Sequence, residues 1–340
     1  MKQVLIIPRN GYINRLQAIA SAQILADQIG AELKVAWVPQ DAAPAEAKTV
    51  FNSTLIDSNF ISEEKCQKMC GFLPSEIPRY LKTSATESGV RVVTLAGYDL
   101  GEQYFMRELR GLINTQKGSQ VIAISAGGRF SLESESQSIE WDSPTFQLDR
   151  FRWYSELKFH EEIESAIRSA AGSEPYLGLH LRYSDRSHQT PTRREINEAV
   201  QKLAREANIR RIFIASDSRS ERERWSIKLK ERGFSVWWYD SGGGNRNQEL
   251  GALGALIDWR LLGMSKSLVY FKESSYGYEA AVLTKNFFGS LGLEANRILS
   301  LANRGQKFTR NAITVPKRRG WASIKLLKKK VIQLKKTWET

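Results

Sequence analysis

The sequence predicts an α/β protein with two halves, each a parallel sheet covered by helices, and a cleft between them. Three observations predict this fold class. The chain has 340 residues, more than one hydrophobic core usually supports, so two domains are the default. Its N-terminal part reads as strand, loop, helix and strand. Its second half alternates short apolar runs with helical patterns, which is typical of a parallel sheet with covering helices.

The N-terminal strand–loop–helix unit comes first. Val4–Ile7 is apolar enough for a buried strand, and Pro8 ends it. A polar turn around Gly11 follows, and apolar residues spaced by three and four then predict a helix that ends at Gly30. Leu33–Val38 reads as the next strand. A glycine-containing loop that opens a helix can receive an anion on helix N–H groups, although this one is neither a Walker loop nor a GxGxxG motif.

The rest of the first half is less regular. Residues 39–90 contain four prolines and little periodicity. Arg91–Leu95 and Val121–Ser125 read as two strands, separated by a helix near Glu102–Ile113. The serine-rich and acidic run Ser131–Asp142 predicts a surface loop, and we place the domain boundary near its end.

The second half shows the alternation of strands and helices most clearly. A connecting helix is predicted at Phe151–Ala171. The predicted strands are Tyr176–Leu181, Arg211–Ser216, Phe234–Tyr239 and Ser267–Phe271. The predicted helices are Thr192–Ala204, Ser218–Arg232, Gln248–Met264 and one that opens at Ser274. Thr192 is the expected N-cap of the first of these, and Glu195 completes a capping box.

Polar side chains follow the strands of this second half. They are His180, Arg182, Asp185, Asp217, Ser274 and Ser275, with Asp258 on the helix before the last strand. Parallel strands end at one edge of the sheet, where open α/β proteins bind ligands. The set combines a guanidinium and hydroxyls for phosphate with carboxylates for a base or ribose. Each residue alone also has an ordinary structural explanation, as a helix cap or a surface ion pair. The prediction of a ligand-binding site therefore rests on their gathering at one sheet edge, not on any single residue.

These residues resemble motifs of the fucosyltransferase superfamily that includes α1,6-, bacterial nodulation and protein O-fucosyltransferases. His180–Arg186 looks like its H-x-R-x-x-D-[KR] motif, and Arg211–Asp217 like its strand ending in Ala-Thr-Asp. Ile257–Ser265, followed by Ser274–Tyr276, resembles the third motif. Arg9–Leu16 is similar to the family's Gly-x-x-Asn-[RQ] loop, so the matches occur in order along most of the chain.

The resemblance implies a GT-B glycosyltransferase, in which two Rossmann-like domains with parallel sheets face each other across a cleft. Residues 1–148 would form the acceptor-side domain and residues 149–310 the domain that binds the nucleotide sugar. The implied reaction is an inverting transfer of fucose from GDP-fucose to a glycan acceptor, without a metal or other cofactor. No Asp-x-Asp sequence is present that would hold a divalent cation in other glycosyltransferases.

The resemblance also implies roles for single residues. Arg182 would hold the β-phosphate and stabilise the leaving GDP, because a guanidinium acts where the negative charge develops. Asp258 would accept hydrogen bonds from guanine, with His180 near the base through its backbone. The other donor-binding candidates are Gly11, Asn14, Arg15, Asp217, Ser274, Ser275 and Tyr276, with Asn14 reaching across the cleft from the first domain.

The chain departs from the family pattern at two positions. Tyr183 stands where the first motif often has a second arginine, which removes one phosphate contact. Thr190 stands where some members carry an acid, so the general base is not carried over. His188 and Asp185 are the candidates, and a base titrating near the working pH favours His188. The alternative is that His188 is a solvated loop histidine.

The positive charge of the chain is concentrated in a tail, residues 311–340. Nine lysines and arginines and no acidic residue lie between Lys317 and Lys336. Because the net charge of the chain is +13, the rest of the chain carries a net charge of only +4 (13 minus 9). Apolar residues spaced as on one helix face accompany them, so the tail is expected to bind an anionic membrane surface, to pack across the first domain, or to remain solvated. We expect a cytoplasmic enzyme, peripheral on the inner membrane face if the first alternative holds.

Two further alternatives stay open at the level of the sequence. A GT-B enzyme could use another nucleotide sugar, because an arginine and serines serve any diphosphate. A non-enzymatic binder of nucleic acid or another polyanion is disfavoured, because no nucleic-acid module is recognisable.

Cys66 and Cys70, the only cysteines, would share one helix face; we expect reduced thiols rather than a disulfide or a metal site.

Overall fold

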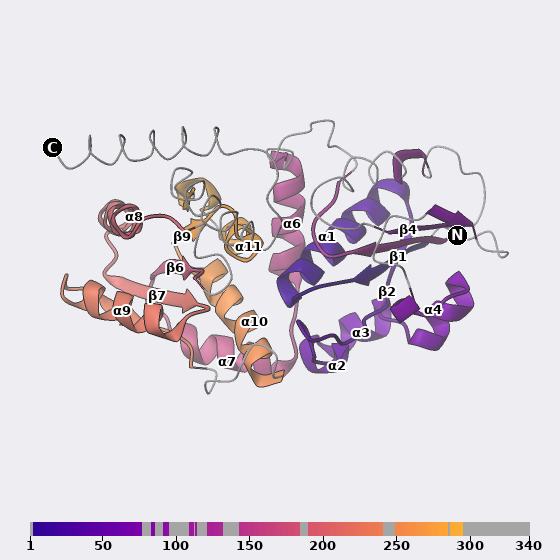
Figure 1. The fold of residues 1–340 in the computed structure, drawn as a ribbon, viewed down its shortest axis with the longest axis horizontal. Coiled ribbons are helices and arrows are strands. Elements are labelled where there is room, and N and C mark those ends of the chain that lie inside the picture. Colours follow the sequence, from indigo (N-terminus) through magenta and orange to yellow (C-terminus); the bar gives the residue numbers. More distant parts are fainter. Residues whose placement is uncertain are drawn as a thin grey trace, which may run out of the picture. The chain divides into compact units, whose positions relative to one another are not determined.

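The structure, a computed structural model, is an α/β protein with two five-stranded sheets (Figure 1). It describes residues 3–76, 83–85, 91–94, 109–111, 113, 121–131, 143–183, 190–240, 249–284 and 286–294. Residues 1–295 form one compact unit that contains both sheets. The predicted tail at 311–340 lies outside the described residues.

The first sheet is mostly parallel and has the strand order β2-β1-β5-β4-β3. Its strands are β1 (Gln3–Pro8), β2 (Glu32–Val35), β3 (Thr83–Ala85), β4 (Arg91–Thr94) and β5 (Val121–Ala126). β1 lies between β2 and β5, and both pairings are parallel. Only β3, at the edge, runs antiparallel to its neighbour. β1 is therefore flanked on both sides, which explains its uninterrupted apolar sequence.

The second sheet is parallel throughout and has the order β10-β9-β6-β7-β8. Its strands are β6 (Leu177–Leu181), β7 (Arg211–Ser216), β8 (Ser235–Trp237), β9 (Ser267–Phe271) and β10 (Leu291–Leu293). The central strands β6 and β9 are buried at every position. The carboxyl ends of β6, β7 and β9 therefore lie along one edge, as the sequence predicts.

The helices of the first half include one long helix and several short ones. Helix α1 (Tyr12–Ile29) follows β1 and ends at Gly30, whose φ of 62° is left-handed, so the predicted C-terminus is confirmed. The irregular stretch after β2 contains α2 (Ala47–Val50), α3 (Ser53–Asn59), α4 (Glu63–Cys70) and the 3-10 turn η1 (Pro74–Glu76). Cys66 and Cys70 are free, and both face the core from α4. Most of the helix predicted near Glu102–Ile113 lies outside the described residues.

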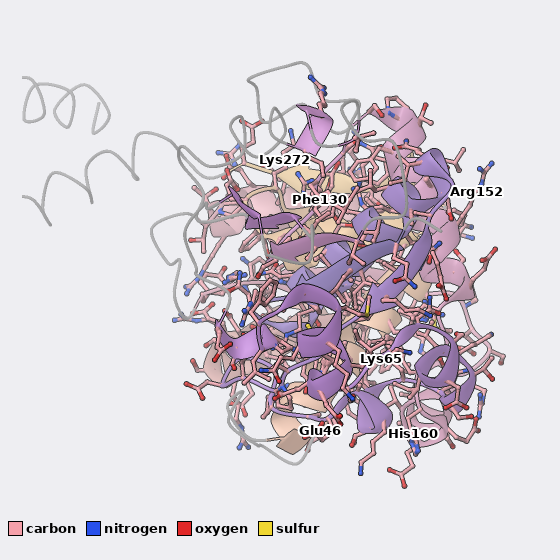
Figure 2. The ribbon with its side chains drawn as sticks, turned by 90° about the vertical axis from the view of Figure 1, so that its right-hand side faces the viewer. Glu46, Lys65, Phe130, Arg152, His160 and Lys272 are labelled. Atoms are coloured by element: carbon pink, nitrogen blue, oxygen red, sulfur yellow. The ribbon has the colours of Figure 1, made fainter. Side chains whose placement is uncertain are left out.

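The prediction of a single connecting helix at Phe151–Ala171 is wrong. Two helices are present, α6 (Pro144–Glu156) and α7 (Glu161–Ala171). Between them Phe159 bridges to Phe51 of the first half, and His160, labelled in Figure 2, caps α7. The break is tertiary in origin, because an apolar side chain that leaves the helix is stabilised by aromatic neighbours that the local sequence does not show.

The helices of the second half follow the predicted order. They are α8 (Arg193–Ala207), α9 (Arg219–Lys230), α10 (Glu249–Met264) and α11 (Ser275–Leu283), followed by the 3-10 turn η3 (Phe287–Gly289). The capping box of Thr192 and Glu195 at the start of α8 is confirmed. Asp217 is not the cap of α9; that position belongs to Ser218.

One continuous apolar core connects the two sheets. It contains buried residues of α1, such as Ile19, together with Trp259 of α10 and Leu283 of α11. The helices α1, α6, α10 and α11 pack against one another between the sheets (Figure 1). Gly263 permits the close contact of α10 with α11, because a Cβ there would lie 2.4 Å from Cδ2 of Leu283.

Buried tyrosines make the stability of this core sensitive to alkaline pH. Burial raises the pKa of Tyr270 on β9 from 10 to about 12. Between these values the folded protein keeps a proton that the unfolded chain loses, so the free energy of unfolding falls as pH rises. For Tyr270 alone the fall is about 1.4 kcal/mol by pH 11. Tyr270→Phe is therefore expected to lose less stability than the parent protein between pH 9 and 11, measured by urea unfolding. Equal losses in both proteins would contradict the assignment.

Candidate active site

The carboxyl end of β6 carries the first group of candidate residues. His180 is a buried residue near the end of the strand, and Arg182, partly buried, follows the last strand residue directly. The backbone N–H of Tyr183 donates to Oδ1 of Asp217 at 2.7 Å. Asp217 therefore ties the end of β6 to the end of β7 and fixes the chain direction immediately after Arg182.

The start of α11 forms the second group. Ser274 is its N-cap and accepts a hydrogen bond from the N–H of Gly277. The ring of Tyr276 stacks on the imidazole of His180, with 5.2 Å between centroids and 27° between planes. Gly277 permits this approach, because a Cβ there would lie 2.6 Å from Nδ1 of His180. The first turn of α11 is thus packed directly on β6.

Asp258 is brought towards the same group through α10. The Tyr276 hydroxyl donates to the carbonyl of Ala255 at 2.7 Å, and Asp258 lies three residues after Ala255 on the same helix. Residues three apart are neighbours on a helix surface. Asp258 therefore lies on α10 within one turn of the carbonyl that Tyr276 contacts.

A contact from the first half completes the arrangement. The Ser275 hydroxyl donates to Oδ1 of Asn14 at 3.0 Å, across 261 residues of sequence. Asn14 lies in the first turn of α1 and Ser275 in the first turn of α11. The N-termini of two helices therefore meet, and their aligned N–H groups and dipoles favour an anion at this point. Gly11, the N-cap of α1, has no side chain to occupy its first-turn N–H groups.

Arg15, predicted with the donor-binding residues, is fully buried inside the first half. Its Nε and Nη1 donate to the carbonyls of Asn10 and Val38 at 2.9 and 2.8 Å, and its guanidinium stacks on Trp37. Burial lowers the pKa of Arg15 to about 10, so it stays charged at neutral pH. In this position Arg15 supports the loop that precedes α1.

The loop between β1 and α1 has a further anchor that the sequence analysis did not single out. Asn10 has a φ of 67°, and its side-chain amide donates to the carbonyl of Gly127 at 3.3 Å. Arg9 donates to the Ser125 hydroxyl at 3.0 Å, at the end of β5. A non-glycine residue in the left-handed region is uncommon, and asparagine is the type that favours it. The Asn10-Gly11 pair was the signal available in the sequence.

The structure brings Asn14, Ser275, Tyr276, His180 and Arg182 to one edge of the second sheet, and Asp217 is tied to the same edge. Asp258 lies on α10, whose Ala255 carbonyl Tyr276 contacts. This set can bind an anion at two helix N-termini and a planar group beside aromatic rings. Asp185 and His188 lie outside the described residues. Within the described part of the chain, no three His, Cys, Asp or Glu side chains gather as they would around a metal ion, and no helix is long and apolar enough to span a bilayer.

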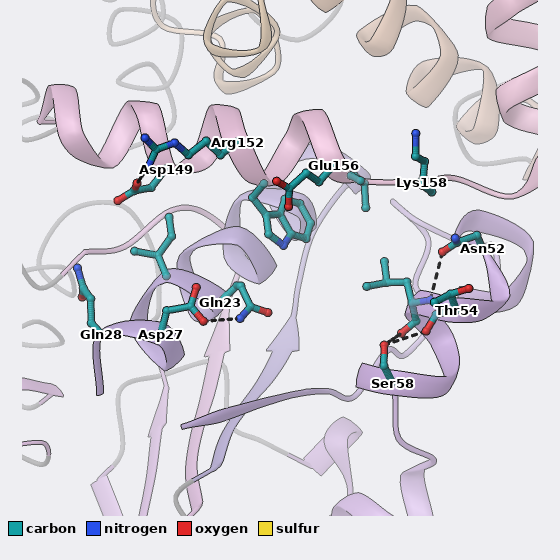
Figure 3. Close-up of a pocket in the computed structure, with 14 residues that line it drawn as sticks. Gln23, Asp27, Gln28, Asn52, Thr54, Ser58, Asp149, Arg152, Glu156 and Lys158 are labelled. Carbon is teal, nitrogen blue, oxygen red and sulfur yellow. Dashed lines mark hydrogen bonds and ion pairs between the residues drawn. The ribbon is translucent and has the colours of Figure 1, made fainter. Parts of the chain in front are cut away.

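A separate groove of about 700 Å³ lies along the C-terminal half of α1 (Figure 3). It is lined by Gln23 and Asp27 of α1, by residues of α3, and by Asp149, Arg152 and Trp153 of α6. Because Asn14 belongs to the first turn of α1 and the groove begins at Gln23, about 14 Å of helix separates the groove from the candidate site. Its side chains pair with one another, as Gln23 does with Asp27.

Comparison with known proteins matches this chain to solved fucosyltransferase structures. A NodZ α1,6-fucosyltransferase co-crystallised with GDP superimposes with a TM-score of 0.52 and 14% identity, covering 84% of this chain and 93% of that one. Selenomethionine NodZ from Bradyrhizobium gives 0.51 and 15%, with the same coverage. An Arabidopsis thaliana FUT1 variant bound to GDP gives 0.56 and 14%, covering 83% of this chain and 68% of that one. No family model and no curated protein matches the sequence.

The match spans both sheets and therefore concerns the whole described architecture. At 14–15% identity it is a statement about the fold. The GT-B-like fold class is confirmed at that level, and the solved structures that match are fucosyltransferases, the family that the four sequence motifs suggested. This chain has a two-sheet fold similar to that of the solved NodZ and FUT1 structures.

Proposed function

We propose that this protein is a glycosyltransferase that transfers fucose from GDP-fucose to a glycan acceptor, with inversion at the anomeric carbon and without a catalytic metal. The observation that carries the proposal is the contact between Asn14 and Ser275, which joins two helix N-termini beside the end of β6, where Arg182 lies. Two positive helix ends and a guanidinium suit a diphosphate. The GDP in crystals of NodZ and FUT1 supports the choice of nucleotide.

In the proposed reaction an acceptor oxygen attacks C1 of fucose on the face opposite GDP. The new C1–O bond forms while the bond from C1 to the β-phosphate oxygen breaks, and GDP leaves with the bonding electron pair. Arg182 and the N–H groups at the starts of α1 and α11 stabilise the charge that appears on the diphosphate. The acceptor proton passes to a general base, for which His188 and Asp185 remain the candidates.

Guanine recognition is assigned to Asp258. Its two carboxylate oxygens can accept from the adjacent N1–H and N2–H groups of guanine, and uracil offers no such adjacent pair of donors. The rings of His180 and Tyr276, which stack on each other, would lie beside that base. Hydrogen bonds to a charged group contribute about 1.5–3 kcal/mol, which is enough to set a nucleotide preference.

A thermal-shift panel of GDP, UDP, ADP and CMP tests the proposal. We expect GDP to raise the melting temperature most, since a ligand at a hundredfold excess over Kd adds about 2.7 kcal/mol of stability. Asp258→Asn should remove most of the GDP shift and leave the smaller UDP shift unchanged. Equal shifts with all four nucleotides would instead favour the second candidate function, a GT-B enzyme that uses another nucleotide sugar.

The proposal includes the basic tail, residues 311–340, as the segment that binds a cytoplasmic enzyme to an anionic membrane surface. Its lysines would each add about 1 kcal/mol near an anionic surface. Deleting residues 317–340 is expected to abolish sedimentation with anionic vesicles and to leave GDP affinity unchanged. Loss of both activities would point to the polyanion binder that the net charge of +13 first suggests.

A further inference from the structure

A buried carboxylate joins the helix that starts the candidate site to the helix that connects the two halves. Glu279 lies on α11 four residues after Ser275, and Arg150 and Tyr154 lie four residues apart on α6. Residues at this spacing share one face of a helix. Nε and Nη2 of Arg150 donate to the two oxygens of Glu279 at 3.1 and 3.3 Å, and the Tyr154 hydroxyl donates to Oε2 at 2.8 Å.

The three central residues of the network are closed to solvent, and the network extends into the first half. Glu279, Arg150 and Tyr154 are each 0% exposed. Arg129, in the loop after β5, places Nη1 3.6 Å from Oε1 of Glu279, and its guanidinium lies over the ring of Tyr278. Three segments that are distant in sequence therefore converge on one carboxylate: the end of β5, the middle of α6 and the second turn of α11.

Stability alone does not account for such a network. Removing two charges from water costs about as much as their attraction returns, and apolar side chains of similar size often give equal stability. A bidentate pair instead fixes both the distance and the rotation of the two helices that carry it. Burial and the charge of Glu279 raise the pKa of Tyr154 well above its ordinary value, so this hydroxyl remains a donor. The distinctive contribution of the network is geometric.

We propose that Glu279 is a positioning residue that holds α11 against α6 and thereby keeps Ser275 in contact with Asn14 before the donor binds. The second turn of α11 is then the anchor, and the first turn presents its N–H groups to the diphosphate together with those of α1. The proposal rests on the proposed function and names the buried residues that assemble its donor site.

Glu279→Gln tests this role, with Tyr278→Phe as the matched control. The control removes a neutral hydrogen bond of 3.0 Å from Gln147, which joins the same two helices. For Glu279→Gln we expect the KM for GDP-fucose to rise about tenfold and kcat at saturating donor to change less than threefold. The reason is that apparent affinity scales with the fraction of molecules already in the competent arrangement. Tyr278→Phe should leave both parameters within about twofold.

If Glu279 only stabilised the fold, its replacement would change kcat and not KM. Partial unfolding lowers kcat with the amount of active enzyme and leaves KM unchanged, and that result would overturn the proposal. Because Glu279→Gln leaves Arg150 buried without its carboxylate, a second variant keeps the test sharp. Arg150→Met combined with Glu279→Leu removes both charges of the bidentate pair, so neither is left buried alone, and KM is expected to remain about tenfold raised.

Hydrogen exchange gives a readout that needs no substrate. Without nucleotide, the amides of α11 are expected to exchange about tenfold faster in Glu279→Gln and in the double variant, and at the parent rate in Tyr278→Phe. Parent-like exchange and parent-like KM in the double variant would refute the proposal. A parent protein that fails to bind GDP would count against the proposed function, while the exchange comparison would still decide whether Glu279 orders α11.

Discussion

Replacing Arg182 with alanine is expected to lower the turnover of GDP-fucose by about 10²–10³-fold while the protein remains folded. Arg182 follows β6 directly and lies at the edge where Ser275 and Asn14 meet. Removing one preorganised donor from a developing anion typically costs this much in kcat. The measurement is the rate of GDP release from GDP-fucose, with water as the minimal acceptor, alongside circular dichroism of the variant.

Two further variants separate geometry from charge. Arg182→Lys keeps the positive charge but loses the planar fork, and it should recover only part of the lost rate. Arg219→Ala is the matched control, because Arg219 opens α9 after β7 in the same sheet but is 80% exposed and pairs with Glu223. It should stay within about twofold of the parent. Parent-like turnover in Arg182→Ala would disprove the assigned role.

Arg150→Met is expected to have the largest effect on stability, lowering the free energy of unfolding by about 3–5 kcal/mol. The substitution removes the bidentate partner of Glu279, which is 0% exposed, and leaves it only the Tyr154 hydroxyl and Arg129 at 3.6 Å. A buried charge that loses its main partner is costly. Chemical denaturation at pH 7 measures the loss as a shift of the midpoint at constant slope.

The same helix supplies the control for this prediction. Arg152 is two residues away on α6, pairs with Asp149 at 3.4 Å and has a side chain that is 64% exposed (Figure 3). Arg152→Met should change stability by less than about 1 kcal/mol, because an exposed ion pair is screened by water. Similar losses for both variants would show that the energetic cost does not arise from burial of the charge.

Local patterns predicted the elements that depend on neighbours in sequence. The bounds of β7 and β9, the capping box at Thr192 and the end of α1 at Gly30 agree with the sequence analysis. Each is decided within a few residues, by alternation, by a side-chain cap or by a left-handed glycine. The separation of α6 from α7 escaped prediction because Phe159 packs on Phe51, more than a hundred residues earlier.

The candidate site divides in the same way. Motif order predicted that His180, Arg182, Asp217 and Ser275 gather at one sheet edge, since parallel strands end on the same side. The sequence could not distinguish Arg15, which supports a loop from inside the first half, from an arginine that faces a ligand. An arginine just after a glycine turn can take either role, and only its burial in the folded protein shows which one Arg15 has.

By itself the sequence determined the two-sheet α/β class, the strand that ends just before Arg182 and the family resemblance, because these follow from periodicity and from residues a few positions apart. Only the tertiary structure decided that the starts of α1 and α11 meet and that Glu279 is the partner of Arg150. Such contacts join segments more than a hundred residues apart, and the packing that brings these segments together cannot be inferred from the sequence around either one.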